Sequence, residues 1–127
     1  WMIAAKKGSI VNIASVVGLK GVAYMSAYGA AKAGLINFSR ASAIEAAPYV
    51  RVNCIIPGAV LTPATKRAIP NDDLLEATKN AIPLKRIAEP IELARPILFL
   101  LSSDASFITA ASLVVDGGKT GDLNAGN

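Results

Sequence analysis

The stretch that decides the fold is Gly8-Ser9-Ile10-Val11-Asn12-Ile13-Ala14-Ser15, a short β-branched run entered through a glycine and followed by a hydroxyl side chain. Such a run is typical of a strand in a parallel sheet that is covered on both faces. Two further runs share the pattern, at residues 50–56 and 112–115, and each is closed by turn residues. The three runs predict strands at 9–14, 50–56 and 112–115.

Helical stretches separate these strands. An alanine-rich segment at about 26–46 stops before Pro48, a weaker one covers about 72–80, and a third covers about 90–101. Pro96 inside the third predicts a bend or a shortened first part. The order of strand, helix, strand, helical excursion, helix and strand predicts an α/β fold with right-handed crossovers, in one domain over residues 1–127. The polar tail from Thr120 is expected to be loose.

Composition narrows the classes of function. Of 127 residues 53% are apolar, yet no apolar run approaches the ~18 residues that span a bilayer, so we expect no membrane segment. No histidine is present, which removes Ser-His-Asp catalysis and imidazole zinc sites, and we expect no metal. The net charge of +4 comes from scattered Lys and Arg, which argues against nucleic-acid binding. A single cysteine, Cys54, favours a reducing, cytoplasmic setting.

Three side chains could meet at the carboxyl end of the first strand. Tyr28 and Lys32 are four residues apart on a predicted helix, so they lie about one turn apart on one face. Ser15 follows the first strand at the edge where parallel sheets place their ligand crevices. A phenol beside an ammonium can exchange a proton with an alcohol oxygen, and a serine can hold that oxygen.

Spacing alone does not decide this interpretation. A Tyr and a Lys four apart on a helix are more often ordinary packing or surface residues, and a lone Ser after a strand is more often a turn residue or cap. Tyr24, four residues before Tyr28, is a rival. It lacks a lysine at the next turn and is expected to be a packing or substrate-pocket residue.

The surrounding motifs add a resemblance. The stretches GSIVNIASVVG (8–18) and AYGAAKAG (27–34), with thirteen residues between Ser15 and Tyr28, closely resemble the short-chain dehydrogenase/reductase family. The stretches VNCIIPGAVLT (52–62) and LVVDGG (113–118) are similar to its sixth strand with the Pro-Gly turn and to its final strand.

The resemblance implies a role for each matched residue. Ser15 would bind the substrate oxygen, Tyr28 would be the general acid/base, and Lys32 would favour the ionised Tyr28 and bind the nicotinamide ribose. The cofactor, NAD or NADP, would also be lined by residues after the second strand, namely Pro57, Gly58, Val60 and Thr62. Segment 63–85, which contains three prolines, would be the mobile segment that closes over substrate; taken alone it would be an ordinary surface loop.

Part of the family pattern is missing from this sequence. The Gly-rich turn and the Asn-containing segments, which precede the serine in the family, are absent. The expected fold class is therefore α/β, the carboxyl-terminal half of a Rossmann-type doubly wound parallel sheet. The strand at 9–14 would otherwise have a bare edge, so we expect further chain upstream or a covering polypeptide. The enoyl-reductase branch has Tyr seven residues before the Lys, where this chain has Met25.

Two hypotheses follow. The first is an oxidoreductase that transfers a hydride between NAD(P)(H) and a ketone or secondary alcohol, assembled as a homo-oligomer, either a dimer or a tetramer. The second is a catalytically incomplete piece that acts only in oligomerisation or structure, through the small residues Ala30, Ala31, Ala33 and Gly34 of the long helix.

Overall fold

The chain folds around a small parallel sheet. The structure, a computed structural model, describes residues 1–122. Its strands β1 (Gly8–Ile13), β2 (Val50–Pro57) and β3 (Ser112–Val115) are all parallel and lie in the order β1-β2-β3. Four α-helices connect them, α1 (Ser26–Ala46), α2 (Pro63–Ala68), α3 (Asp72–Asn80) and α4 (Pro90–Leu101), together with two 3-10 turns, η1 (Val16–Gly18) and η2 (Ser103–Ala105).

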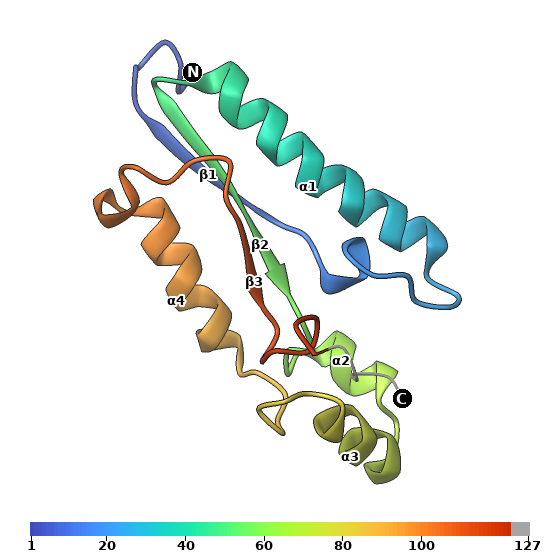
Figure 1. The fold of residues 1–127 in the computed structure, drawn as a ribbon. Coiled ribbons are helices and arrows are strands. Elements are labelled where there is room, and N and C mark those ends of the chain that lie inside the picture. The colour runs from blue at the N-terminus through green and yellow to red at the C-terminus, as the bar shows by residue number, and fades with distance from the viewer. Residues whose placement is uncertain (123–127) are drawn as a thin grey trace.

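Figure 1 shows the arrangement of the layers. Helix α1 lies along one side of the sheet and α4 along the other, while α2 and α3 gather at the end where β2 finishes. The sheet therefore has helices on both faces, and its carboxyl edge carries the segments that follow all three strands. The predicted α/β fold with parallel strands is confirmed.

Most predicted elements are found within one residue of their expected bounds. The first strand begins and ends one residue earlier than predicted, and the second extends to Pro57. Helix α4 runs unbroken through Pro96, so the expected shortening was wrong. Helix α2 was missed, because the prolines of segment 63–85 suggested a loop; in the structure Pro63 occupies its first turn, where a missing N–H costs nothing.

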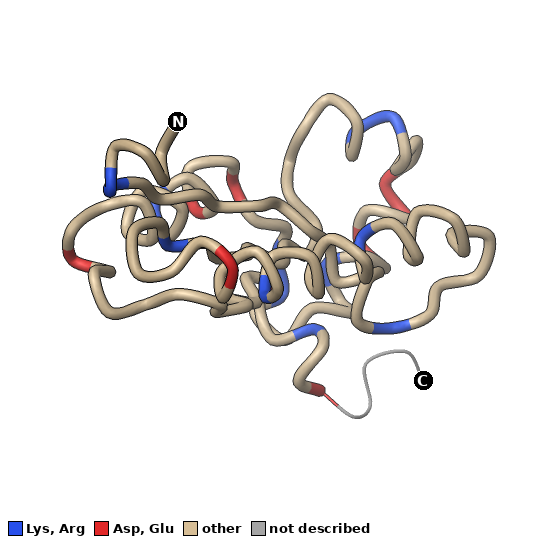
Figure 2. Tube along the Cα trace, turned by 90° about the horizontal axis from the view of Figure 1, so that it is seen from above, with Lys and Arg blue, Asp and Glu red and all other residues tan. Residues whose placement is uncertain are grey.

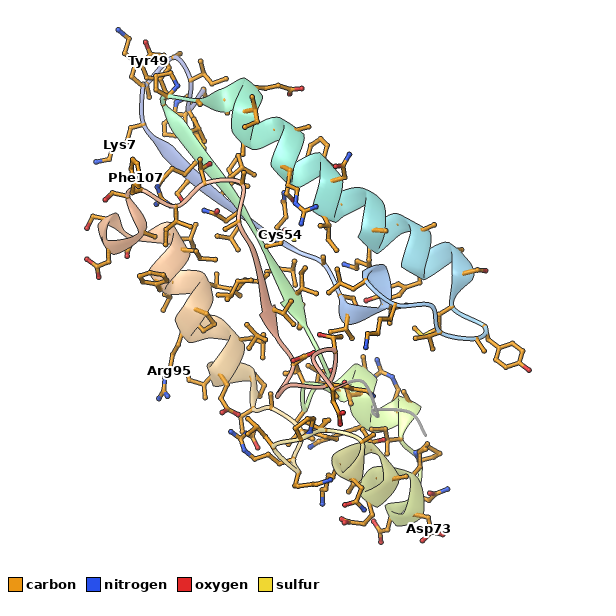
Figure 3. All side chains as sticks on the ribbon, in the orientation of Figure 1. Lys7, Tyr49, Cys54, Asp73, Arg95 and Phe107 are labelled. Atoms are coloured by element: carbon orange, nitrogen blue, oxygen red, sulfur yellow. The ribbon has the colours of Figure 1, made fainter. Side chains whose placement is uncertain are left out.

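The central strand β2 alternates its side chains between the two helical layers. Val50, Val52, Cys54 and Ile56 face α1, where Ile36 and Ala43 complete two buried clusters. Ile55 faces the other way into a cluster with Leu93 and Leu100 of α4. Figure 3 places Cys54 near the middle of the sheet. This burial on both faces explains why β2 is an almost unbroken apolar run.

Two polar residues of β2 tie the end of α4 to the sheet. The Arg51 guanidinium donates to the carbonyl oxygens of Leu100 at 2.8 Å, Ser102 at 2.9 Å and Ile108 at 3.2 Å. The fully buried Asn53 amide donates to the same Ile108 oxygen at 2.9 Å and accepts from the Ala111 N–H at 3.0 Å. The bonds to Leu100 and Ser102 satisfy carbonyls that the last turn of α4 leaves without partners within the helix.

Charged residues of both signs are interspersed along the chain. In the view of Figure 2, Lys and Arg segments and Asp and Glu segments both occur at several places along the trace. Within residues 1–122 no helix is long and apolar enough to cross a membrane. The same stretch contains no group of three or more Cys, Asp and Glu side chains arranged to hold a metal ion.

Candidate active site

Ser15 stands where β1 leaves the sheet. Its extended backbone starts the η1 turn, and its Oγ accepts a hydrogen bond from the Val17 N–H at 3.3 Å. The turn closes when the Gly18 N–H donates to the Ser15 carbonyl at 2.9 Å. Because the Oγ is an acceptor in the first bond, its own O–H can still donate to a ligand oxygen.

The η1 turn packs directly on the backbone of α1. A Cβ added to Gly18 would lie 2.8 Å from the Lys32 carbonyl carbon and 2.8 Å from the Ala33 nitrogen. A Cβ added to Gly29 would lie 3.1 Å from the Val17 carbonyl oxygen. Two glycines therefore permit the approach that brings the turn after Ser15 against the turn of α1 that carries Lys32.

Tyr28 and Lys32 lie one turn apart on α1, as the spacing predicts. The Lys32 Nζ donates to the carbonyl oxygen of Ile13, the last residue of β1, at 2.8 Å. The same Nζ is 5.7 Å from the centre of the Tyr28 ring, within the range of a cation–π contact. The Tyr28 side chain is 45% exposed, so its hydroxyl is open to a ligand. One lysine thus joins the end of β1 to the tyrosine.

Tyr24, the rival tyrosine, has a different setting. Its backbone has a left-handed φ of +65°, and its side chain is fully exposed. It does not pack against the core, so the expectation of a packing residue was wrong, while the alternative of a substrate-pocket residue stays a prediction.

The four residues expected to hold a cofactor lie on one continuous segment after β2. Pro57 ends the strand, and the Gly58 N–H donates to the Val115 carbonyl at 3.0 Å. Val60 forms a parallel bridge with Ala88. In this bridge Ala88 bonds to the backbone of the residues on either side of Val60, so the Val60 N–H faces away from Ala88. The Thr62 Oγ1 accepts from the Thr65 N–H at 3.1 Å and caps α2, a role that sequence reasoning missed.

A hydrogen-bonded turn follows β3 at the same edge of the sheet. The Asp116 carboxylate accepts from the Gly118 N–H at 2.8 Å and from both the N–H and the hydroxyl of Thr120 at 2.7 Å. Burial acts to raise the pKa of Asp116, but the hydrogen bonds from Thr120 and Gly118 outweigh it and hold this pKa below its usual value. Gly117 and Gly118 supply the left-handed backbone that the turn needs, with φ of +67° and +89°.

This turn corrects one expectation about the tail. Thr120 is fixed by Asp116 and is not loose, while residues 123–127 lie outside the described part of the chain. The signal was present in the sequence, because an Asp followed by two glycines is typical of a turn in which the carboxylate accepts from later backbone N–H groups. The segment after Asp116 is thereby directed back toward the turn after Ser15.

Comparison with known proteins places this geometry in a family. A family model described as Enoyl-(Acyl carrier protein) reductase matches residues 1–120, which include Ser15, Tyr28 and Lys32. The chain belongs to the short-chain dehydrogenase/reductase family.

Two relatives in this family show how far the likeness extends. The 3-oxoacyl-[acyl-carrier-protein] reductase FabG of Chlamydia trachomatis is 46% identical over 118 residues, which are 92% of this chain and 47% of the relative. The cyclopentanol dehydrogenase of Comamonas sp. is 39% identical over 120 residues, 94% of this chain and 48% of the relative. The chain thus spans about half the length of these curated short-chain dehydrogenases.

A solved structure of the family shares the fold. It is a putative NAD(P)-dependent gluconate 5-dehydrogenase from Beutenbergia cavernae with bound NADP, and it is 35% identical. The TM-score is 0.91 over 95% of this chain and 49% of the neighbour. The likeness confirms the predicted fold class, the carboxyl-terminal half of a Rossmann-type doubly wound sheet.

Proposed function

We propose that the complete natural protein is an oxidoreductase that transfers a hydride between NAD(P)(H) and a carbonyl compound or secondary alcohol. The observation that carries the proposal is the Lys32 ammonium, which is held on the end of β1 at 2.8 Å and lies 5.7 Å from the Tyr28 ring, next to the turn after Ser15. These are the three side chains that proton transfer to an alcohol oxygen requires.

Each side chain has a distinct task in this proposal. In the reducing direction the Tyr28 hydroxyl gives its proton to the substrate oxygen, and in the oxidising direction it takes a proton back. The Ser15 hydroxyl donates a hydrogen bond to the same oxygen and stabilises the charge that develops on it. The Lys32 ammonium lies over the Tyr28 ring and positions it. Acid–base catalysis of this kind contributes about 10²–10⁴-fold to a rate.

The residues present suit the nicotinamide half of the cofactor. After its bond to Ile13, the Lys32 ammonium has two remaining donors for ribose hydroxyls. Pro57, Gly58, Val60 and Thr62 follow the carboxyl end of β2, and the Val60 N–H is directed away from its bridge partner. When bound, NAD or NADP supplies or accepts the hydride. The NADP in the Beutenbergia structure supports this choice of cofactor class.

The test is a pair of tyrosine variants in the complete protein. Tyr28→Phe removes the transferable proton, so kcat is expected to fall by about 10²–10⁴-fold while the Kd for NAD(P)H changes by less than about twofold. Tyr49→Phe is the matched control, because Tyr49 lies at the opposite end of the sheet, just before β2 begins (Figure 3), and this change should leave both quantities unchanged. Near-normal kcat in Tyr28→Phe would overturn the role of Tyr28.

The relatives do not agree on one substrate. Their names describe an acyl carrier protein thioester, a neutral cyclic alcohol and a sugar acid. The family model is described as an enoyl reductase. Met25, seven residues before Lys32, argues against that reaction here. We therefore propose a reaction on ketones and secondary alcohols. The names of the relatives do not decide the class of substrate.

The surface of α1 supports assembly as a homo-oligomer, dimer or tetramer. Two large apolar side chains of α1 are exposed, Phe38 at 60% and Ile44 at 72%. The same observation favours the second candidate function, a purely structural or oligomerisation role. Intact mass with a nicotinamide titration separates the two: a purified chain of 127 residues that binds no cofactor favours the structural role.

The buried free thiol of Cys54 supports a cytoplasmic setting.

A further inference from the structure

A hollow of about 320 Å³ lies beside the turn after Ser15. One wall comes from the segment after β1, which contributes Val16, Val17 and residues 20–22, and the other wall comes from Lys119 and Thr120 after β3. Its volume is at the lower end of the range for small-molecule pockets. Val16 directly follows Ser15 in the chain, so the wall of the hollow begins one residue after the serine.

The lining of the hollow is partly apolar and partly positively charged. Val16, Val17 and Val22 make it apolar, whereas its only charged side chains are Lys20 and Lys119. Neither ammonium forms an ion pair with a side chain in residues 1–122. An anion that entered the hollow could interact favourably with both ammonium groups.

Lys119 is placed by fixed structure. Its neighbour Thr120 is bonded to Asp116 through both its N–H and its hydroxyl, and Gly118 on the other side is bonded to the same carboxylate. The Lys119 N–H also donates to the Asp116 carbonyl at 3.4 Å. The residue as a whole is partly buried. A lysine whose backbone is held in place favours a charged ligand group more than a mobile surface lysine does.

We propose that this hollow binds an anionic group, a carboxylate or a phosphate, carried by the substrate whose carbonyl oxygen lies at Ser15. This inference rests on the proposed function and deepens it by naming the substrate class. The residues proposed for the cofactor, 57–62, do not line the hollow, which separates it from the nicotinamide site. Lys20 and Lys119 are accordingly specificity-determining residues that act on binding.

The experiment uses the complete protein with NADP(H) and three probes of one skeleton: 4-oxocyclohexanecarboxylate, its methyl ester and 4-oxocyclohexyl phosphate. Calorimetric Kd values and kcat/KM are measured for each probe. We expect at least one anion to bind roughly tenfold or more tightly than the neutral ester, as charge-assisted hydrogen bonds do. The carboxylate and phosphate arms show which anion is preferred.

Four variants, one of them a control, locate the preference. Lys119→Met and Lys20→Met should each remove most of it by raising the Kd and KM of the anion, while kcat and values for the ester stay within about twofold. Lys7→Met is the matched control, because Lys7 lies at the opposite end of the sheet, where β1 begins (Figure 3). Lys119→Arg, which keeps the charge, should retain the preference.

The outcomes are distinguishable. Equal affinity for anion and ester, or equal losses for both in the lysine variants, would overturn the anion subsite. A change in the cofactor Kd without a change in the anion Kd would also overturn it, since the lysines would then bind the nucleotide. Selective anion binding without turnover of any probe would preserve the subsite and count against the proposed redox function.

Discussion

Gly18→Ala tests the contact that assembles the site. The added Cβ would lie 2.8 Å from two backbone atoms of α1, whereas ordinary contact begins at 3.4 Å, so the η1 turn must move away from α1 by about 0.6 Å. The atoms it meets belong to helical backbone and cannot rotate aside. Overpacking of this kind costs about 1–3 kcal/mol. Because the turn follows Ser15 and the helix carries Tyr28 and Lys32, the movement separates the serine from the tyrosine and the lysine.

The functional effect follows from that distance. A displacement of 1 Å in a catalytic group costs on the order of 100-fold in rate, so a shift of 0.6 Å should lower kcat by roughly tenfold. The Tm should fall by roughly 5 °C. Steady-state kinetics on any secondary alcohol that the protein oxidises, with thermal unfolding by circular dichroism, measure both quantities.

Gly34→Ala provides the control. A Cβ at Gly34, on the same helix, meets no heavy atom within 4 Å. This substitution should leave kcat unchanged and stabilise the helix by up to about 1 kcal/mol, because alanine is the better helix former. If Gly18→Ala and Gly34→Ala were alike in kcat and Tm, the close approach of the η1 turn to α1 would not position Ser15, and the reasoning would fail.

Two further predictions concern the framework around the site. Arg51→Met should destabilise the protein by about 2–4 kcal/mol in urea unfolding, because it removes the donors to the carbonyls of Leu100, Ser102 and Ile108; an unchanged midpoint would show that water replaces the guanidinium. Glu92, paired with Arg86 at 2.6 Å and bonded to the Glu89 N–H, has its pKa lowered to about 2, so its contribution to stability is present above about pH 4.5 and is lost as the pH falls toward 2. The Tm difference between wild type and Glu92→Gln should therefore shrink between pH 5 and pH 2, and a constant difference would contradict the assignment.

Local signals explain why most of the fold could be predicted from the sequence. Helix α1 ends before Pro48, and β2 is an apolar run closed by Pro57-Gly58, so both were placed to within a residue. Helix α2 shows the limit of that approach. Thr62 followed by Pro63 is a good start signal for a helix, but the segment contains further prolines that suggested a loop.

The candidate site was predictable only in part. Ser15, Tyr28 and Lys32 could be placed near one another because a strand end and a helix face are local features. That the Thr62 hydroxyl caps α2 depends on where α2 begins, which the sequence did not reveal. That Lys119 faces the turn after Ser15 depends on the Asp116 turn and on the return of the chain from β3, and no local pattern encodes that return.

Cys54 offers a way to measure how often helix α1, which carries Tyr28 and Lys32, separates from the sheet. The thiol has no exposed surface and lies in the cluster with Ala14 and Ile36, between β2 and α1. A reagent can reach it only when α1 separates from the sheet, so the rate of alkylation reports how often that separation occurs. The alkylation rate of this single cysteine therefore measures how often α1, the helix that carries Tyr28 and Lys32, separates from the sheet.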